Sequence, residues 1–271
     1  MARKKRNSTK NRGNGNVQSV TRHPNRAKDK HVARVERGNK ELAEEQRTRR
    51  EGYDLDWFKP TSKQKEIIYS ICDNDLTLCA ASSGTGKTTT AIWQGLKEVK
   101  AGNFKRILFI KTPNESTDDK IGYLPSSAED KLAVHFEATR SVFQQFMSAE
   151  KLAMEEKHGR ILMKIPNFVQ GATFDDTLII IDESQSISPP ILKLLLERSG
   201  FNTKCIVLGD KRQRYSKDKR DDGFTDLVQM VTDIDEDGRY SKIETIGYVE
   251  MTAADNMRSD LSKLIVSLYE A

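Results

Sequence analysis

The chain has 271 residues and a formal net charge of +5, and this length suffices for one α/β domain with a full core. No run of about 18 apolar residues occurs, which argues against a transmembrane helix, and the basic N-terminal region lacks the apolar core of a secretory signal. The three cysteines have no C-x-x-C spacing, and the four histidines are scattered. We therefore expect core thiols in a reducing cytoplasm, no membrane partner and no zinc site.

The charge is concentrated at the N-terminus. Residues 1–50 carry 16 Lys and Arg against 5 Asp and Glu, a net of +11, which leaves −6 for the rest of the chain. A basic tail of this kind typically contacts a polyanion, most often nucleic acid; the alternative is a solvated leader that aids solubility. With almost nothing apolar to bury, residues 1–51 are expected to be a flexible tail, disordered to about residue 33 and then loosely helical. The folded domain is expected at 52–271.

The folded part alternates between helix-like and strand-like segments. Strands are expected at 76–80, 106–110, 161–165, 178–181, 205–208 and 248–251. Helices are expected at 62–72, from the glycine-rich loop to about 100, at 128–156, from about 188 to 200 and at 259–269, with a polar irregular stretch at 214–242. This alternation predicts right-handed crossovers and a mostly parallel sheet flanked by helices. Ligands of such sheets gather where the strands end.

The stretch 75–90, DLTLCAASSGTGKTTT, orders an apolar run, a turn of small residues and a helix start. Such an arrangement binds phosphate, because successive backbone N–H groups and the positive end of the helix dipole point at the anion. In the loop pattern G-x-x-x-x-G-K-[ST], Lys87 reaches the β- and γ-phosphates and the Thr88 hydroxyl ligates Mg²⁺. The alternative is a glycine-rich turn before an ordinary helix. The predicted nucleotide-binding residues are Ala81, Ser82, Ser83, Gly84, Thr85, Gly86, Lys87 and Thr88.

One position departs from the usual loop pattern, since Ala81 occupies the place of the first glycine. If that position requires a positive φ, alanine costs about 1 kcal/mol or more. The rest of the loop is intact, so we expect phosphate binding to survive.

A second motif follows the apolar strand at 178–181, which ends in Asp182-Glu183. In this Walker B arrangement the aspartate holds Mg²⁺, usually through water. The adjacent Glu183 is placed to orient and deprotonate an attacking water molecule. An acidic pair can also be a solvated strand end, but its occurrence together with the phosphate loop favours the functional interpretation.

Three further residues carry weaker signals. Gln213, in GDKRQ at 209–213, suits a sensor that contacts a γ-phosphate and water, or it lies in a polar loop. Gln64 suits recognition of an adenine edge, or it closes a capping box with Thr61. Arg258 precedes the last helix, where it can act as an arginine finger, supplied in trans to a neighbouring subunit, or remain a surface arginine.

Together these blocks resemble the PhoH family of P-loop ATPases, related to the ATPase core of superfamily 1 helicases. The resemblance runs from about residue 58 to 269. It depends on Gln64, the phosphate loop, KTP at 111–113, IGYLP at 121–125, QGATFDDTLIIIDESQ at 170–185, GDKRQ at 209–213 and the Arg258 segment. Departures are Ala81 for the usual glycine, and Lys111 and Gln170 for usual arginines. The last two weaken or retune a contact to phosphate or nucleic acid, because neither reproduces a bidentate arginine.

The resemblance implies a single RecA-like domain that uses ATP and Mg²⁺ and acts on single-stranded nucleic acid, RNA rather than DNA. It implies nucleic-acid contacts from Lys111, Thr112, Gln170 and Thr173, and a homo-oligomer, as a hexameric ring. Compact forms of this kind are similar to the phage-encoded members, which would place the chain in the host cytoplasm.

Two alternatives come from other classes of protein. One is a nucleic-acid-binding protein whose ATPase is regulatory or decayed; Ala81 is its only support. The other is a packaging ATPase similar to a phage terminase, for whose nuclease domain 271 residues leave no room. A small-molecule P-loop kinase fits less well still, because it has no use for the GDKRQ segment or the basic tail.

Overall fold

The computed structural model describes residue 35 and residues 52–112, 135–169, 171–211, 222–235 and 238–270. The chain divides into two compact units, Met1–Arg47 and Thr48–Ala271. In the first unit only Val35 is described, so the predicted disorder of the tail lies outside the described residues. The boundary expected at residues 51 and 52 stays a prediction.

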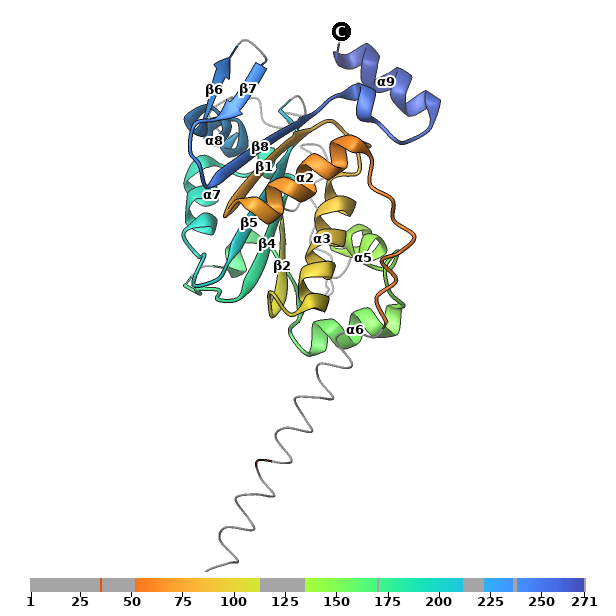
Figure 1. The fold of residues 1–271 in the computed structure, drawn as a ribbon, viewed down its shortest axis with the longest axis vertical. Coiled ribbons are helices and arrows are strands. Elements are labelled where there is room, and N and C mark those ends of the chain that lie inside the picture. Colours follow the sequence, from red (N-terminus) through yellow and green to blue (C-terminus); the bar gives the residue numbers. More distant parts are fainter. Residues whose placement is uncertain are drawn as a thin grey trace, which may run out of the picture. The chain divides into compact units, whose positions relative to one another are not determined.

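A six-stranded sheet forms the centre of the second unit (Figure 1). Its order is β3-β2-β4-β5-β1-β8, and each neighbouring pair is parallel. The strands are β1 (Leu76–Ala81), β2 (Arg106–Lys111), β3 (Ile161–Lys164), β4 (Thr177–Asp182), β5 (Lys204–Gly209) and β8 (Ile246–Met251). Parallel pairing brings the carboxyl ends of these strands to one edge, which we call the carboxyl edge.

Helices cover both faces of the sheet (Figure 1). One face carries α2 (Ser62–Asp73), α3 (Lys87–Ala101), α5 (Glu137–Phe143) and α6 (Ala149–Lys157). The other carries α7 (Pro189–Leu196) and α8 (Gly223–Val231). The short 3-10 helices are η1 (Pro166–Phe168), η2 (Ser184–Ser186) and η4 (Ala253–Asp255).

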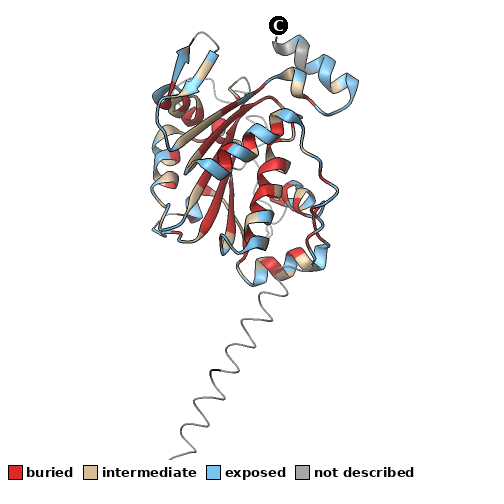
Figure 2. Cartoon of the chain, viewed as in Figure 1, coloured by how far each residue is buried: buried red, intermediate tan, exposed pale blue. Residues whose placement is uncertain are grey.

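The core explains why the strands are continuously apolar (Figure 2). Successive strand side chains point to opposite faces, so a strand covered on both sides is apolar at every position. In β4, Leu178 and Ile180 pack with α3, whereas Ile179 and Ile181 pack on the side of α7 and α8. All four are fully buried, and this fixes the register that carries Asp182 to the carboxyl edge.

Two expectations about the secondary structure were wrong. The helix expected at 128–156 is, in its described part, two helices, because Ser148 caps a new helix by accepting a hydrogen bond from the Lys151 N–H. The stretch 214–242 contains α8 and an antiparallel hairpin, β6 (Thr232–Asp235) and β7 (Gly238–Ser241). The amphipathic pattern of Phe224, Val228 and Val231 predicts α8 in hindsight.

The predicted fold class is confirmed: this is an α/β domain with a parallel sheet flanked by helices. Helix α9 (Asp260–Glu270) follows β8 and exposes an apolar stripe made of Leu261, Leu264, Ile265 and Leu268. Among the helices that the structure describes, none combines the length and hydrophobicity that crossing a membrane requires.

Candidate nucleotide site at the carboxyl edge

The phosphate loop connects β1 to α3 as predicted from the sequence. Gly84 (φ 83°) and Gly86 (φ 77°) take the left-handed conformation, which favours glycine. The Thr85 hydroxyl donates to the Ser82 carbonyl (3.0 Å) and holds the turn closed. Gly86 is the N-cap residue of α3 and makes no side-chain hydrogen bond to the helix. The first N–H groups of the helix therefore face the loop with no cap side chain accepting from them.

Ala81 does not carry the expected strain. It is the last residue of β1 and pairs with Met251 in β8. Among the described residues other than glycine, positive φ values occur at Asp176, Glu183 and Asn202, and not at Ala81. The alanine therefore fits its extended backbone without the cost that a left-handed position would impose.

Lys87, Thr88 and Asp182 meet at the carboxyl edge. The Lys87 ammonium group, which is 8% exposed, donates to the Ala81 carbonyl (3.3 Å). The Thr88 hydroxyl donates to Oδ2 of Asp182 (3.1 Å), although 94 residues separate the two in sequence. This contact joins the phosphate loop to the end of β4, as the two-motif interpretation requires.

Burial raises the pKa of the Asp182 carboxyl, and the charge of Glu183 raises it further, while Lys87, Lys111 and Thr88 act in the opposite direction. The folded chain thus disfavours the charge that Asp182 carries at neutral pH. A divalent cation beside this carboxylate would offset that cost. Thr88 and Asp182 supply the oxygen ligands that Mg²⁺ prefers, and Mg²⁺ sites use one or two carboxylates together with substrate phosphates. The residues therefore fit Mg²⁺.

Glu183 lies at the turn after β4 in the left-handed conformation (φ 53°). Its backbone N–H donates to Oδ1 of Asp182 (3.0 Å), and its carboxylate accepts from Nε2 of Gln185 (2.7 Å). The Gln185 carbonyl oxygen accepts from the backbone N–H of Asp210 (3.1 Å). Gln185 was not among the predicted site residues; its position two residues after the glutamate was the available signal.

Gln64 has the contacts of the capping-box alternative. Its Oε1 accepts from the Thr61 N–H (3.0 Å) and its N–H donates to the Thr61 hydroxyl (3.3 Å). Its Nε2 donates to the Thr85 carbonyl (3.0 Å) and lies 3.1 Å from the sulfur of Met257. Gln64 is 1% exposed, and its amide is already hydrogen-bonded to the phosphate loop. In this structure it therefore stabilises the loop and does not present its amide to a base.

Residues 256–258 form a strap over the phosphate loop, which the sequence analysis missed apart from Arg258. The Met257 N–H donates to the Gly84 carbonyl (2.9 Å), and the Asn256 amide donates to the Ser83 carbonyl (3.3 Å). A Cβ atom at Gly84 would lie 2.7 Å from Oδ1 of Asn256, so the glycine also permits this close approach.

Arg258 contacts its own chain. Its Nη1 donates to Oγ of Ser83 (3.3 Å), and its backbone N–H donates to Oδ1 of Asn256 (2.8 Å). In this structure the strap turns the Arg258 side chain onto the phosphate loop of its own chain, and its action toward a neighbouring subunit stays a prediction.

The predicted nucleic-acid contacts do not all lie together. Lys111 pairs with Asp182 in the sheet register, so Lys111 and Thr112 are at the carboxyl edge. Thr173 lies beside Gly200, where β4 and β5 begin, and is therefore separated from them. Gln170 and Gln213 lie outside the described residues. The described part of the GDKRQ segment ends at Lys211, whose ammonium group bonds to Tyr248 and Glu250 of β8.

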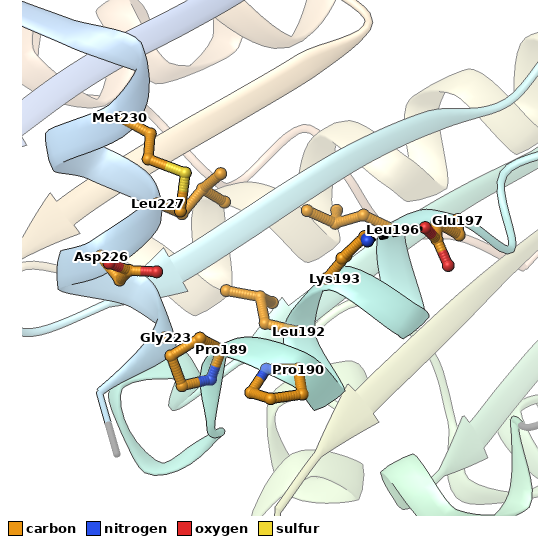
Figure 3. A pocket seen from close by; sticks show the side chains of 10 residues that line it. All are labelled: Pro189, Pro190, Leu192, Lys193, Leu196, Glu197, Gly223, Asp226, Leu227 and Met230. Carbon is orange, nitrogen blue, oxygen red and sulfur yellow. Dashed lines mark ion pairs between the residues drawn. The ribbon is translucent and has the colours of Figure 1, made fainter. Parts of the chain in front are cut away.

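An apolar hollow of about 680 Å³ lies between α7 and α8 (Figure 3). It contains none of the predicted site residues, so it is separate from the nucleotide site. Its lining residues are Pro189, Pro190, Leu192, Lys193, Leu196, Glu197, Gly223, Asp226, Leu227 and Met230.

Several curated proteins are similar to this chain in sequence. A PhoH-like protein of Synechocystis sp. (strain ATCC 27184 / PCC 6803 / Kazusa) is 27% identical over 210 residues, and one of Bacillus subtilis (strain 168) is 26% identical over 210 residues. The alignments cover 78% of this chain but 61% and 63% of those relatives, so the chain spans about three-fifths of their length.

Similar solved structures are more distant. The ATPase domain of the Thermus phage P74-26 large terminase has a TM-score of 0.44 and 12% identity, covering 77% of this chain and 92% of that chain. The Pyrococcus furiosus Hef helicase domain has a TM-score of 0.42 and 13% identity, and the alignment covers 73% of this chain and 40% of that chain. Likeness at this level supports no conclusion about activity or partners.

The family match, in contrast, covers most of the chain. The sequence profile of the family described as "PhoH-like protein" matches residues 59–270, which include the phosphate loop and Asp182-Glu183. The chain with the carboxyl-edge site described above therefore belongs to the PhoH family.

Proposed function

We propose that the protein is an Mg²⁺-dependent ATPase. The observation that carries this proposal is the Thr88–Asp182 hydrogen bond (3.1 Å), which brings the two metal-binding groups together beside Lys87. Two separate segments of the chain, the phosphate loop with Lys87 and Thr88 and the end of β4 with Asp182, thus meet at one edge of the sheet.

The residues have distinct roles in this proposal. Lys87 neutralises charge on the β- and γ-phosphates, together with the loop N–H groups. Thr88 and Asp182 would hold Mg²⁺, which spreads and neutralises the charge of the transferred phosphoryl group. Glu183 orients the attacking water and accepts its proton. Arg258, next to Ser83, stabilises charge that develops on the phosphates.

We further propose that hydrolysis is coupled to binding or remodelling of single-stranded nucleic acid, with RNA favoured by the family resemblance. Lys111 supports this proposal, since it places a cation at the carboxyl edge next to the end of β4. The net charge of +11 in residues 1–50 adds a second electrostatic contact. Thr112 and Gln170 are the neighbouring polar contacts in this proposal; Thr173 would belong to a separate contact.

We also propose that copies of the protein assemble into a ring and that the protein acts in the cytoplasm. The exposed stripe on α9 supports it, because four apolar side chains at helical spacing form a surface that a second copy would bury. In such a ring, a neighbouring copy would supply the second domain with which motors of this type close around a nucleotide.

The test is ATP turnover by the full chain, measured alone, with poly-RNA and with single-stranded DNA. We expect Mg²⁺-dependent turnover that poly-RNA stimulates more than DNA does. Lys87→Ala is the control, and it should lose nucleotide binding because the phosphates lose their cation. ATP binding without turnover in the wild-type chain would favour a nucleic-acid-binding protein with a decayed ATPase. Turnover that neither polymer changes would contradict the coupling.

A further inference from the structure

Gln185 occupies a buried position between two strand ends. It lies in η2, directly after the β4 turn, and is 5% exposed. Its amide donates to Oε2 of Glu183 (2.7 Å) and accepts from the backbone N–H of Asp210 (3.1 Å). A carboxylate only accepts and a backbone N–H only donates, so a side-chain amide satisfies both neighbours at once.

Glu183 needs support at this turn. Its left-handed backbone (φ 53°) is unfavourable for a residue with a side chain, so surrounding contacts must hold it. Two hydrogen bonds hold the Glu183 backbone. Its N–H donates to Oδ1 of Asp182 (3.0 Å), and its carbonyl accepts from the Ser186 N–H (2.9 Å). Within the part of the chain that the structure describes, the Glu183 carboxylate accepts its hydrogen bond from the Gln185 amide. The direction of the carboxylate therefore depends on that amide.

The same turn is fixed to the neighbouring strand. The Ser184 hydroxyl donates to the Leu208 carbonyl in β5 (2.6 Å), two residues before Asp210 in the sequence. Asp210 is the second residue of the GDKRQ segment, and the next residue, Lys211, bonds to Glu250 of β8 (3.1 Å). Gln185 thus joins Glu183 to a segment that is itself tied to the far strand of the sheet.

We propose that Gln185 is a positioning residue for ATP hydrolysis: it aims the Glu183 carboxylate and couples it to the start of the 209–213 segment. This inference rests on the proposed ATPase activity. Gln185 acts through Glu183, so it should affect kcat and leave ATP binding nearly unchanged.

Two substitutions separate the bonds that Gln185 makes. Gln185→Glu keeps an acceptor for the Asp210 N–H but cannot donate to Glu183. Gln185→Leu removes both bonds at similar size. If the orientation of the Glu183 carboxylate determines the rate, kcat should fall about 10- to 100-fold in both variants, as expected for a misplaced catalytic group. The Kd for ATP should stay within about threefold, since the phosphate contacts remain.

Gln94→Leu is the matched control. Gln94 is another buried glutamine (2% exposed), and its amide donates to Glu98 (2.6 Å) and to the Cys72 sulfur (3.4 Å), farther along α3 than the phosphate loop. It should keep kcat within about twofold of wild type, because its contacts do not touch the catalytic groups. Thermal unfolding of all variants reports general damage separately.

The decisive readout is non-additivity. The Glu183→Gln variant no longer has the carboxylate that Gln185 orients. Adding Gln185→Leu to this variant should therefore lower the single-turnover rate constant by less than about threefold further. Wild-type turnover that Glu183→Gln removes verifies the proposed function in the same assay. With that verified, a Gln185→Glu kcat within about twofold of wild type, or independent losses in the double variant, overturns the positioning role. A wild-type chain that does not hydrolyse ATP overturns the proposed function, and this role with it.

Discussion

The guanidinium group of Arg258 lies 3.3 Å from the Ser83 hydroxyl, so a residue at the start of the last helix contacts the phosphate loop 175 residues earlier in its own chain. Met257 and Asn256 bond to the same loop, at Gly84 and Ser83. The strap therefore makes the connection to α9 a wall of the nucleotide site.

This contact yields a prediction about Arg258. Arg258→Ala should leave ATP binding nearly intact and lower kcat by up to about 10³-fold, the effect of an arginine finger. Arg198→Ala, at the end of α7 away from the site, is the control. Because the structure has Arg258 in cis, mixing Arg258→Ala with Glu183→Gln protein should restore no activity. Restored activity in mixed oligomers with verified subunit exchange would show instead that the arginine serves a neighbouring subunit.

Asp182→Asn should separate stability from activity. Burial and the neighbouring Glu183 raise the pKa of Asp182, so the folded chain is destabilised by this carboxylate at neutral pH. Asparagine removes the charge and still bonds to Thr88 and the Glu183 N–H. Without nucleotide or Mg²⁺ we expect Tm to rise by about 2–4 °C, while Mg²⁺-dependent turnover is lost. Calorimetry that shows a lower Tm would contradict this interpretation of the buried charge.

Glu155 anchors the start of the domain. Its fully buried carboxylate accepts from Tyr53 (2.7 Å) and Arg160 (2.6 Å) and pairs with Lys151 (2.8 Å). Burial alone would raise the pKa of Glu155, but these three donors outweigh it and the pKa is lowered. Glu155→Gln should cost about 3–5 kcal/mol of unfolding free energy at pH 7, because two cations lose their partner.

The pH dependence of that cost has a definite sign. A lowered folded pKa gives stability that is present above the ordinary value of 4.5 and is lost as the pH falls through the folded value. Denaturant unfolding of wild type and Glu155→Gln should therefore differ fully at pH 7 and converge in acid, once the pH has fallen from 4.5 through the lowered folded pKa of Glu155. A difference that stays constant into acid would assign the effect to packing.

The sequence alone predicted those features whose determinants lie close together along the chain. Apolar runs such as 178–181 identify strands buried on both faces, and the glycines of the phosphate loop carry their conformational requirement with them. Parallel topology then explains why Thr88 and Asp182 meet, although 94 residues separate them.

Contacts between distant polar groups were not predictable in this way. Nothing in the local pattern of Gln64 shows that its amide will bond to Thr85, or that Met257 will lie against the same loop. Gln185 needed the register of β4 against β5 to bring Asp210 within reach. The division of the helix expected at 128–156 depends on a single cap, Ser148, within a run of good helix formers.

Removing residues 1–50 tests the basic tail, which lies almost wholly outside the described residues. The deletion removes a net charge of +11, so affinity for single-stranded nucleic acid should fall and its salt dependence should flatten. ATP hydrolysis without nucleic acid should barely change, since the site begins at Gln64. Titrations at several salt concentrations provide the measurement; an unchanged slope would mean that the tail makes no phosphate contacts.

Turnover and binding by Glu183→Gln test the central claim most directly. The substitution keeps the shape of the side chain and removes the base, whereas Lys87, Thr88 and Asp182 stay in place. The account predicts ATP binding with wild-type affinity in a direct titration and Mg²⁺-dependent turnover at least about 100-fold slower than wild type. Turnover near the wild-type rate would contradict the assignment of the carboxyl-edge site as the place where ATP is hydrolysed.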